Sequence, residues 1–214
     1  MLQKISQQKH EINEPFTRQR VNIPIEGGQV EAEFFSFHNL SDGLEHIAIG
    51  LGPWQAVEIP MVRLHSECLT GDVFGSAKCD CGPQLKESIA EISKHGGFLI
   101  YLRQEGRGIG LYNKLDAYKL QQRGFDTFSA NRMLGLPDDS RNYKCAAEIL
   151  SALDVTRIKL LSNNPEKANQ LERLGIKVNE NIRTGVYLSH HNYRYLDAKV
   201  KHTRHSLELK EANK

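Results

Sequence analysis

Hydrophobic and polar residues alternate along the N-terminal third of the chain, a pattern typical of half-buried strands. Alternating apolar positions occupy residues 21–25 and 30–34, and the glycine pair between them is typical of a hairpin turn. Apolar runs over residues 46–50 and 57–64 predict further strands, and the prolines within these segments indicate edge positions or bends. We therefore expect this third of the protein to be rich in β-structure.

After residue 80 helical periodicity alternates with short apolar runs. Leu85, Ile89 and Ile92 recur at helical spacing after Pro83, and proline suits the first turn of a helix. Glycines mark C-terminal ends of the predicted helices, and the Asn164-Pro165 pair marks the N-terminal end of the last one. Helices are expected up to residue 95, up to Gly124, near residues 141–153 and from Asn164 to Gly175; strands at 98–102, 158–161 and 176–178; and a loop at 125–140.

The order of these elements predicts an α/β protein. A β-rich N-terminal part is followed by a βαβ-type layer, in which helices between strands imply parallel pairing. With no internal repeat or low-complexity linker, a single compact mixed-sheet domain is expected over residues 21–196. Residues 1–20 are predicted to be a polar extension, and the basic residues 197–214 a solvated tail rather than a nucleic-acid patch.

Charge and composition narrow the class of protein. The 214 residues include 28 Lys and Arg against 26 Asp and Glu, a net charge of +2 that argues against coating of nucleic acid and leaves room for a local anion pocket. The N-terminus lacks the apolar stretch of a signal peptide, and the apolar run at 98–102 is too short to cross a bilayer. We expect a cytoplasmic protein with neither a nucleic acid nor a membrane as its partner.

The cysteines suggest a metal site. Cys68, Cys79 and Cys81 cluster in a chain whose expected compartment keeps thiols reduced, which favours metal binding over disulfides. Catalytic zinc typically takes three protein ligands and leaves a fourth position for water. His65 lies three residues before Cys68, so a closed structural site of three cysteines and one histidine fits the spacing equally well. Cys145, among alanines on a predicted helix, is expected to be a small core residue.

Three thiolates outweigh the two positive charges of zinc, so a water on such an ion is acidified less than in a site of three histidines. A nearby base would help to form hydroxide, as a glutamate does in zinc deaminases. Glu67, next to Cys68, is an available carboxylate.

Turns between strands and helices suggest contacts to an anion. The glycine-rich segment 104–110 precedes a predicted helix, and Arg107 within it offers a planar donor fork, although a tight turn alone also explains the glycines. The spacing matches neither a dinucleotide fingerprint nor a P-loop. The segment 136–141 contains two carboxylates and an arginine that could belong to an anion site, but capping of the helix predicted near 141–153 also explains them. Lys167 lies in the first turn of a predicted helix, where the dipole disfavours a cation, so it suggests an anion ligand.

Taken together, the segments 63–72, 79–85, 103–111 and 162–165 resemble GTP cyclohydrolase II, in that family's order. The resemblance spans about residues 60 to 196, and the cysteine block is its most specific part. It favours catalytic zinc over structural zinc, which the spacing alone does not. It implies a hydrolase that opens the imidazole ring of GTP and releases formate and pyrophosphate, the first step of riboflavin biosynthesis.

The resemblance also implies roles for individual residues. Cys68, Cys79 and Cys81 would hold Zn²⁺, one ion per chain, which activates water for attack on C8 of guanine. Mg²⁺ would accompany the triphosphate, and the family implies a homodimer. The residues implied to bind GTP are Arg63, Leu64, His65, Ser66, Glu67, Gln84, Glu105, Gly106, Arg107, Thr127, Ser162 and Lys167. The residues implied to act in catalysis are Tyr118 in ring opening, Asp139 as proton acceptor and Arg141 at the α-phosphate, where charge stabilisation suits a protonated guanidinium better than nucleophilic attack.

Some positions depart from the family pattern. Ser162 replaces a common threonine, Lys78 a common arginine and Asn142 a common aspartate, and residues before 60 match only loosely. The alternatives are therefore a paralogue that serves another pathway or stops at the formamidopyrimidine intermediate, and a non-catalytic nucleotide-binding module with structural zinc. Retention of Tyr118 argues against the stopped reaction. A purine deaminase is disfavoured because the H-x-E and P-C-x-x-C signature is absent.

Overall fold

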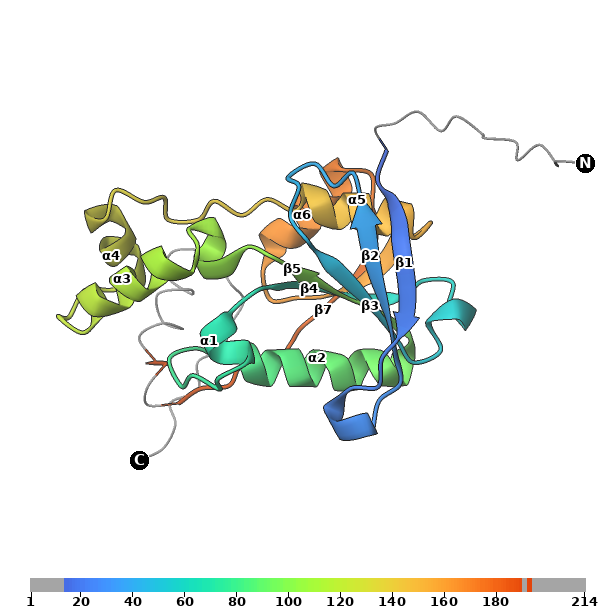
Figure 1. Ribbon diagram of the computed structural model, residues 1–214, viewed down its shortest axis with the longest axis horizontal. Coiled ribbons are helices and arrows are strands. Elements are labelled where there is room, and N and C mark those ends of the chain that lie inside the picture. The colour runs from blue at the N-terminus through green and yellow to red at the C-terminus, as the bar shows by residue number, and fades with distance from the viewer. Residues whose placement is uncertain (1–13, 190–191, 194–214) are drawn as a thin grey trace, which may run out of the picture.

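The computed structural model describes residues 14–189 and 192–193, and the predicted basic tail at 197–214 lies outside them. Within the described residues the strands form one mixed sheet in the order β1-β2-β3-β5-β4-β6-β7 (Figure 1). The strands are β1 (Phe16–Asn22), β2 (Ala32–His38), β3 (Ile47–Leu51), β4 (Met61–Ser66), β5 (Gly97–Leu102), β6 (Arg157–Leu161) and β7 (Lys177–Ile182). This confirms the predicted α/β class and the mixed sheet.

The N-terminal half of the sheet is antiparallel. Strands β1 and β2 form the predicted hairpin, closed by the Ile25–Val30 bridge and a turn in which Gly27 has φ of 66°. Both strands extend further from the turn than predicted. In particular, β1 begins at Phe16, inside the segment 1–20 that was expected to be a polar extension. This edge strand is largely exposed, so backbone pairing with β2 holds it without an apolar pattern.

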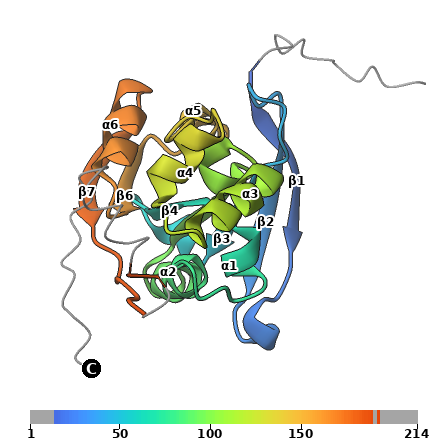
Figure 2. The ribbon, with the colours of Figure 1, turned by 90° about the vertical axis from the view of Figure 1, so that its left-hand side faces the viewer.

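The C-terminal half is parallel, as predicted: β4 pairs with β5 and β6, and β6 pairs with β7. Helix α2 (Cys81–His95) covers one face of the sheet, and α5 (Lys144–Ala152) and α6 (Pro165–Arg173) cover the other (Figure 2). The predicted caps of α6 are confirmed, because the Asn164 side chain accepts a hydrogen bond from the Glu166 amide.

The central strands are buried on both faces. Val62 and Leu64 of β4 pack into the cluster under α5, whereas Met61 faces the cluster under α2. Because successive side chains of a strand point to opposite faces of the sheet, Arg63 and His65 point toward the α2 side. The strand predicted at 57–64 starts later in the structure, because β4 begins only at Met61. Pro60, just before it, has no amide hydrogen to donate to a neighbouring strand.

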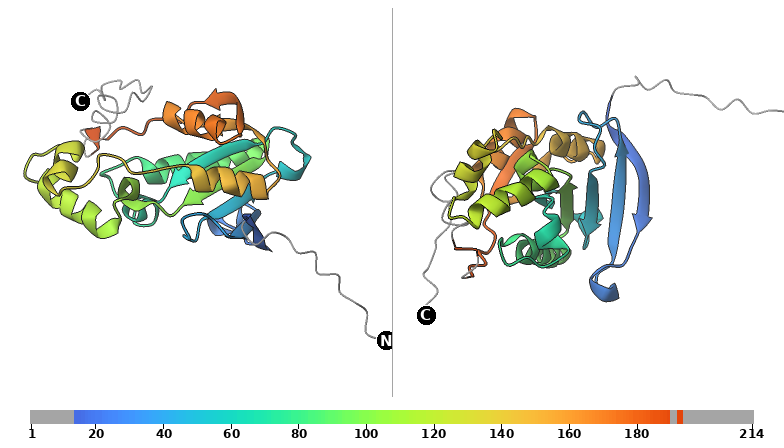
Figure 3. Two further views of the ribbon diagram at one scale, coloured as in Figure 1. Left: turned by 90° about the horizontal axis from the view of Figure 1, so that it is seen from above. Right: turned by 60° about the vertical axis from the view of Figure 1, so that its left-hand side comes forward.

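Helices α3 (Leu111–Gln121) and α4 (Thr127–Met133) extend beyond the end of the sheet (Figures 1 and 3). Helix α4 corrects the prediction of a loop at 125–140. Asp126 caps it by accepting hydrogen bonds from the amides of Phe128 and Ser129, and the helix buries its own Phe128 side chain. In the part of the chain that the structure describes, we find no helix with the length and apolar character needed to span a membrane.

Candidate active site

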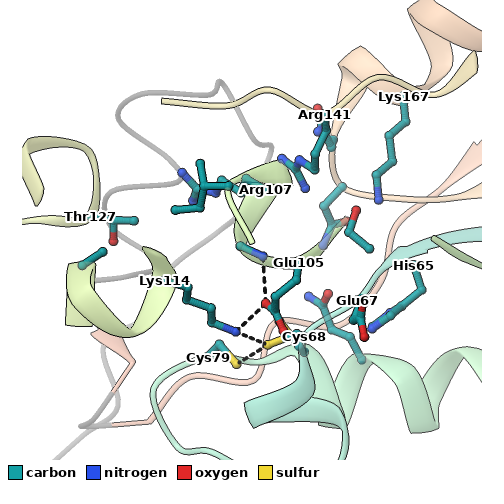
Figure 4. A pocket seen from close by; sticks show the side chains of 18 of the residues that line it. His65, Glu67, Cys68, Cys79, Glu105, Arg107, Lys114, Thr127, Arg141 and Lys167 are labelled. Carbon is teal, nitrogen blue, oxygen red and sulfur yellow. Dashed lines mark hydrogen bonds and ion pairs between the residues drawn. The ribbon is translucent and has the colours of Figure 1, made fainter. Parts of the chain in front are cut away.

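A pocket lies where the parallel strands β4, β5 and β6 end at their carboxyl edge (Figure 4). Such edges are the usual ligand sites of α/β sheets. Residues from β4, the start of α2, the glycine-rich turn, α3, α4 and the β6–α6 turn line it. Cysteine sulfurs lie at one end of this pocket, and the cations Arg107, Arg141 and Lys167 lie at the other.

The sulfur end is shaped for a metal ion. The ligand atoms of Cys68, Cys79 and Cys81 lie within 4.8 Å of one another, and the Cys68 and Cys79 sulfurs are 3.6 Å apart. A tetrahedral zinc ion with bonds of about 2.3 Å places its sulfurs about 3.8 Å apart. Gly71, in the short helix α1 (Leu69–Asp72), completes the cradle: a Cβ there would lie 2.7 Å from the Cys79 sulfur and 3.0 Å from the Cys68 sulfur. The donor set therefore fits a zinc ion.

His65 does not join these sulfurs. Its Nε2 lies 3.1 Å from both carboxylate oxygens of Asp72, its ring stacks on Tyr101, and the group of clustered metal-binding atoms does not include it. Burial lowers the pKa of His65, although Asp72 opposes that shift. A neutral His65 donating through Nε2 to Asp72 has no lone pair there for a metal, which argues against the closed site of three cysteines and one histidine.

Lys114 of α3 is a component of the site that the sequence prediction missed. Its buried ammonium donates to the Cys68 sulfur at 3.2 Å, to Thr70 Oγ1 at 3.1 Å and to Glu105 Oε1 at 2.8 Å. Burial lowers the pKa of Lys114, but the bond to Glu105 and the charge of Cys68 outweigh this and raise it. Hydrogen bonds from Cys79 and Cys81, with the charge of Lys114, hold the pKa of Cys68 far below its usual value.

A second group of potential metal-binding side chains, Asp42, His46 and Cys145, has different chemistry. His46 Nδ1 accepts the amide hydrogen of Arg103 at 2.9 Å, so the neutral ring carries its proton on Nε2, which faces Asp42 at 2.9 Å. That nitrogen has no lone pair to offer a cation. Burial raises the pKa of Cys145 to about 11, and its side chain packs in the core, which confirms its predicted place there.

The glycine-rich turn adopts the left-handed backbone that its glycines permit. Gly106 has φ of 63° and Gly108 of 90°, and Arg107 between them takes φ of 64°, a strained value for a residue with a side chain. The Ser140 amide donates to the Arg107 carbonyl at 3.1 Å, and the Arg107 guanidinium lies over the Phe128 ring at 4.8 Å. The turn therefore directs a cation into the pocket from a position fixed on both sides.

Two further cations are held by backbone carbonyls. Arg63 donates to the Leu161 carbonyl at 3.0 Å and to Gln84 Oε1 at 2.9 Å, while its buried Nε has no hydrogen-bond partner among the residues that the structure describes. Lys167 donates to the Leu64 carbonyl at 2.7 Å. The side chain of Leu64 itself is wholly buried in the core and does not line the pocket, so only the backbone of this predicted ligand contributes.

Asp139 lies outside the pocket lining, where it holds Arg141. The Arg141 Nε donates to Asp139 Oδ1 at 2.9 Å, and the Arg141 amide also donates to that oxygen, at 3.0 Å. Burial raises the pKa of Asp139, but the bonds and charge of Arg141 outweigh it, so the pKa lies below its ordinary value. A carboxylate in this state is a weak proton acceptor and a good anchor for a guanidinium.

Tyr118 lies between two lysines on the sulfur side of the pocket. The ammonium groups of Lys78 and Lys114 are 5.2 and 5.7 Å from its ring centre. Burial raises the pKa of Tyr118 to about 12 even though Lys114 opposes the shift. The phenol is therefore neutral at physiological pH and can donate a hydrogen bond.

A sequence profile described as GTP cyclohydrolase II matches residues 17–183. The chain belongs to the GTP cyclohydrolase II family. The match begins far before residue 60, so the N-terminal hairpin, which was expected to match only loosely, lies within the family domain.

Two relatives of this family are similar over nearly their whole length, and a third over about half of its length. GTP cyclohydrolase-2 of Vibrio cholerae is 47% identical over 194 residues, covering 90% of this chain and 98% of the relative. The protein of the same name from Aliivibrio salmonicida is 48% identical over 197 residues, with coverage of 90% and 98%. The riboflavin biosynthesis protein RibBA of Bacillus velezensis is 47% identical over 192 residues, which cover 88% of this chain and 48% of that protein.

The structure brings most of the predicted site residues of this family member together. All the predicted metal ligands and GTP-binding residues except Leu64 line the pocket, as do Tyr118 and Arg141. Pocket residues that were not among the predicted site residues are Ile109, Asn163 and Asn164, which lie within the motifs, and Lys114, Ala117, Gln121, Asn131 and Thr184, which lie outside them. A signal for Lys114 was present: it lies in the first turns of α3, where the helix dipole disfavours a cation, as at Lys167.

Proposed function

We propose that this protein opens the imidazole ring of GTP and releases formate and pyrophosphate, giving 2,5-diamino-6-(5-phosphoribosylamino)pyrimidin-4(3H)-one, the first step of riboflavin biosynthesis. One observation carries the proposal: a cluster of three cysteine sulfurs and a cluster of cations occupy opposite ends of one pocket. GTP has a base at one end and a triphosphate at the other, so its two reacting parts match these ends.

At the sulfur end, Cys68, Cys79 and Cys81 would hold Zn²⁺. Zinc bound there would supply the Lewis acidity that lets water attack at neutral pH. Tyr118, a neutral phenol beside the sulfurs, would donate a hydrogen bond to the substrate as the ring opens. Glu67 remains the candidate base, and its Oε2 accepts a hydrogen bond from Arg103 Nε at 3.0 Å, which orients the carboxylate at the pocket wall.

At the cationic end, Arg107, Arg141 and Lys167 would bind the triphosphate, and Mg²⁺ bound with the substrate would offset part of its charge. Asp139 would hold Arg141 protonated and oriented, so the guanidinium would stabilise charge at the α-phosphate rather than attack it. Thr127 and Ser162 would add hydroxyl donors at the pocket wall.

The decisive experiment incubates the pure protein with GTP and Mg²⁺ and measures formate and pyrophosphate separately. Cys79→Ser is expected to abolish formate release, because it removes a metal ligand. Arg141→Ala is expected to slow mainly pyrophosphate release. Full formate production by Cys79→Ser would refute the metal mechanism, and mass analysis of the product would reveal a reaction that stops at the formamidopyrimidine.

The same proposal includes a homodimer in the cytoplasm. Thiolate ligands require a compartment that keeps cysteines reduced. Tyr112 of α3 and Met133 of α4 are 81% and 58% exposed, and because these two helices pack together we place the subunit contact on them. Sedimentation of the protein and of Tyr112→Arg tests this part: a wild-type protein that sediments as a monomer at micromolar concentration contradicts it.

A further inference from the structure

The ammonium of Lys114 is committed to the protein although it lines the pocket. A lysine has three N–H donors. Those of Lys114 are matched by the Cys68 sulfur at 3.2 Å and the Glu105 carboxylate at 2.8 Å (Figure 4), and by the Thr70 hydroxyl at 3.1 Å. Because all three N–H groups of Lys114 already have protein acceptors, none is left for a substrate phosphate.

Lys114 is the only charged residue on the buried face of α3. Lys114 and Ala117 are buried, with Lys114 8% exposed, whereas Tyr112 and Leu115 on the same helix are 81% and 46% exposed. Burying an ammonium is costly unless it is paired and hydrogen-bonded. The helix is therefore not generally buried here, and the interaction with the sulfur end explains why this one charge is inside.

Glu105 keeps the ammonium in place. Its Oε2 accepts the Leu69 amide hydrogen at 2.7 Å, and its Oε1 accepts the Gly106 amide hydrogen at 2.7 Å as well as the Lys114 bond. Two backbone dipoles thus share the carboxylate's charge. The carboxylate links the metal loop, the glycine-rich turn and α3, and it holds Lys114 against the Cys68 sulfur.

The charge of the metal centre explains why a cation is placed beside Cys68. Three thiolates carry three negative charges and zinc carries two positive charges, so the centre has an excess negative charge that weakens the ion as an electrophile. A charge-assisted N–H···S bond draws electron density from one sulfur and covers one of its lone pairs.

We propose that Lys114 is a positioning residue of the metal centre, which shields the Cys68 sulfur and offsets the excess negative charge of the three thiolates, while Glu105 holds it there. This inference rests on the proposed function only in assigning zinc to the three sulfurs. It requires no turnover to be tested.

The test measures alkylation of each cysteine in the zinc-loaded full chain by iodoacetamide, which forms an S–C bond as iodide leaves. Peptide mass spectrometry gives the rate for each sulfur in wild type, Lys114→Met, Lys114→Arg and the exposed control Lys119→Met. Loss of a charge-assisted hydrogen bond should raise the Cys68 rate roughly tenfold in Lys114→Met, with changes below about threefold at Cys79 and Cys81. Lys114→Arg should restore protection, and Lys119→Met should match wild type.

GTP binding to the same proteins, measured by rapid mixing before turnover, separates this role from phosphate binding. A loss of GTP affinity in Lys114→Met without a selective rise in the Cys68 rate would assign Lys114 to the triphosphate and overturn the proposal. An unchanged Cys68 rate in Lys114→Met, including no labelling in either protein, overturns the proposal, and so does an equal rise at all three sulfurs. If Lys114→Met does not fold, Glu105→Gln removes the anchor instead, and it must also raise labelling at Cys68 above that at the other two. A selective rise in a protein that produces no formate would leave this inference standing and refute only the proposed reaction.

Discussion

Gly71 provides a sharp test of the sulfur geometry, because the room for its missing side chain is taken by the cysteines. A Cβ at this position would lie 2.7 Å from the Cys79 sulfur, 3.0 Å from the Cys68 sulfur and 3.1 Å from Cys81 Cβ. Ordinary contacts between carbon and its neighbours are about 3.5–4.0 Å. Gly71→Ala therefore introduces an overlap of roughly 1 Å against sulfurs that a bound ion prevents from moving aside.

The expected effects on metal binding and on folding differ in size. Overpacking of this kind costs about 1–3 kcal/mol, which corresponds to a zinc affinity roughly fivefold to 150-fold weaker. Without metal the thiol rotamers can turn away, which leaves only the contact with Cys81 Cβ at 3.1 Å, and alanine in place of a helical glycine gains up to about 1 kcal/mol. Gly71 lies in α1 with no positive φ, so the backbone accepts alanine. The stability of the apo protein should thus change by less than about 1 kcal/mol.

Zinc affinity is measured by competition with a chromophoric chelator, and apo stability by urea unfolding. Gly185→Ala is the matched control, because its added methyl meets only the ends of the Glu87 and Tyr187 side chains, at 3.2 Å. Gly71→Ser should weaken zinc binding further than Gly71→Ala. Wild-type zinc affinity in Gly71→Ala would show that the sulfurs do not surround this position, and the assignment of the metal centre would fail.

Other expectations follow from single contacts. Burial raises the pKa of Tyr118 to about 12, so the phenolate absorbance of wild type should exceed that of Tyr118→Phe only as the pH approaches 12. The stability that the neutral phenol contributes is fully present below its ordinary pKa of about 10 and is lost as the pH rises through 12. An absorbance difference that appears near pH 10 contradicts the burial argument. Asn164→Ala removes the cap bond to the Glu166 amide and should cost about 1 kcal/mol in urea unfolding, while an unchanged midpoint would mean that the cap contributes nothing. Cys145→Ala should leave the zinc content at that of wild type by elemental analysis, since its thiol has no metal-binding partner in His46; a drop in content would revive that cluster as a metal site.

The sequence predicted best what local signals and strong periodicity determine. The parallel strands that are buried on both faces read as apolar runs, and α6 was bounded by its asparagine cap and a terminal glycine. The N-terminal part of strand β1, from Phe16, was missed because its residues are almost all exposed, so pairing with β2 rather than an apolar pattern defines it. Helix α4 is too short for periodicity to emerge, and its cap at Asp126 was the one usable signal.

For the site, the residue types could be predicted from the sequence, but which side chains pair with one another could not. The spacing of the cysteines indicated a metal but left His65 open as a fourth ligand, because nothing local indicates that Asp72 takes its Nε2. Likewise, Leu64 belongs to the motif, yet only its carbonyl faces a functional group, Lys167. Such pairings join residues from different strands and helices, and a linear pattern carries no record of them.

The two ends of the pocket close over very different lengths of chain. Cys68 and Cys79 are 11 residues apart, whereas Lys167 reaches the Leu64 carbonyl across 103 residues. By the logarithmic law for loop closure, the longer connection costs about 2 kcal/mol more in chain entropy. A nascent chain emerging from the ribosome can therefore gather its sulfurs and capture an ion before the segment that carries Lys167 has been synthesised. Metal loading would then precede, and help to organise, the half of the chain that carries Lys167.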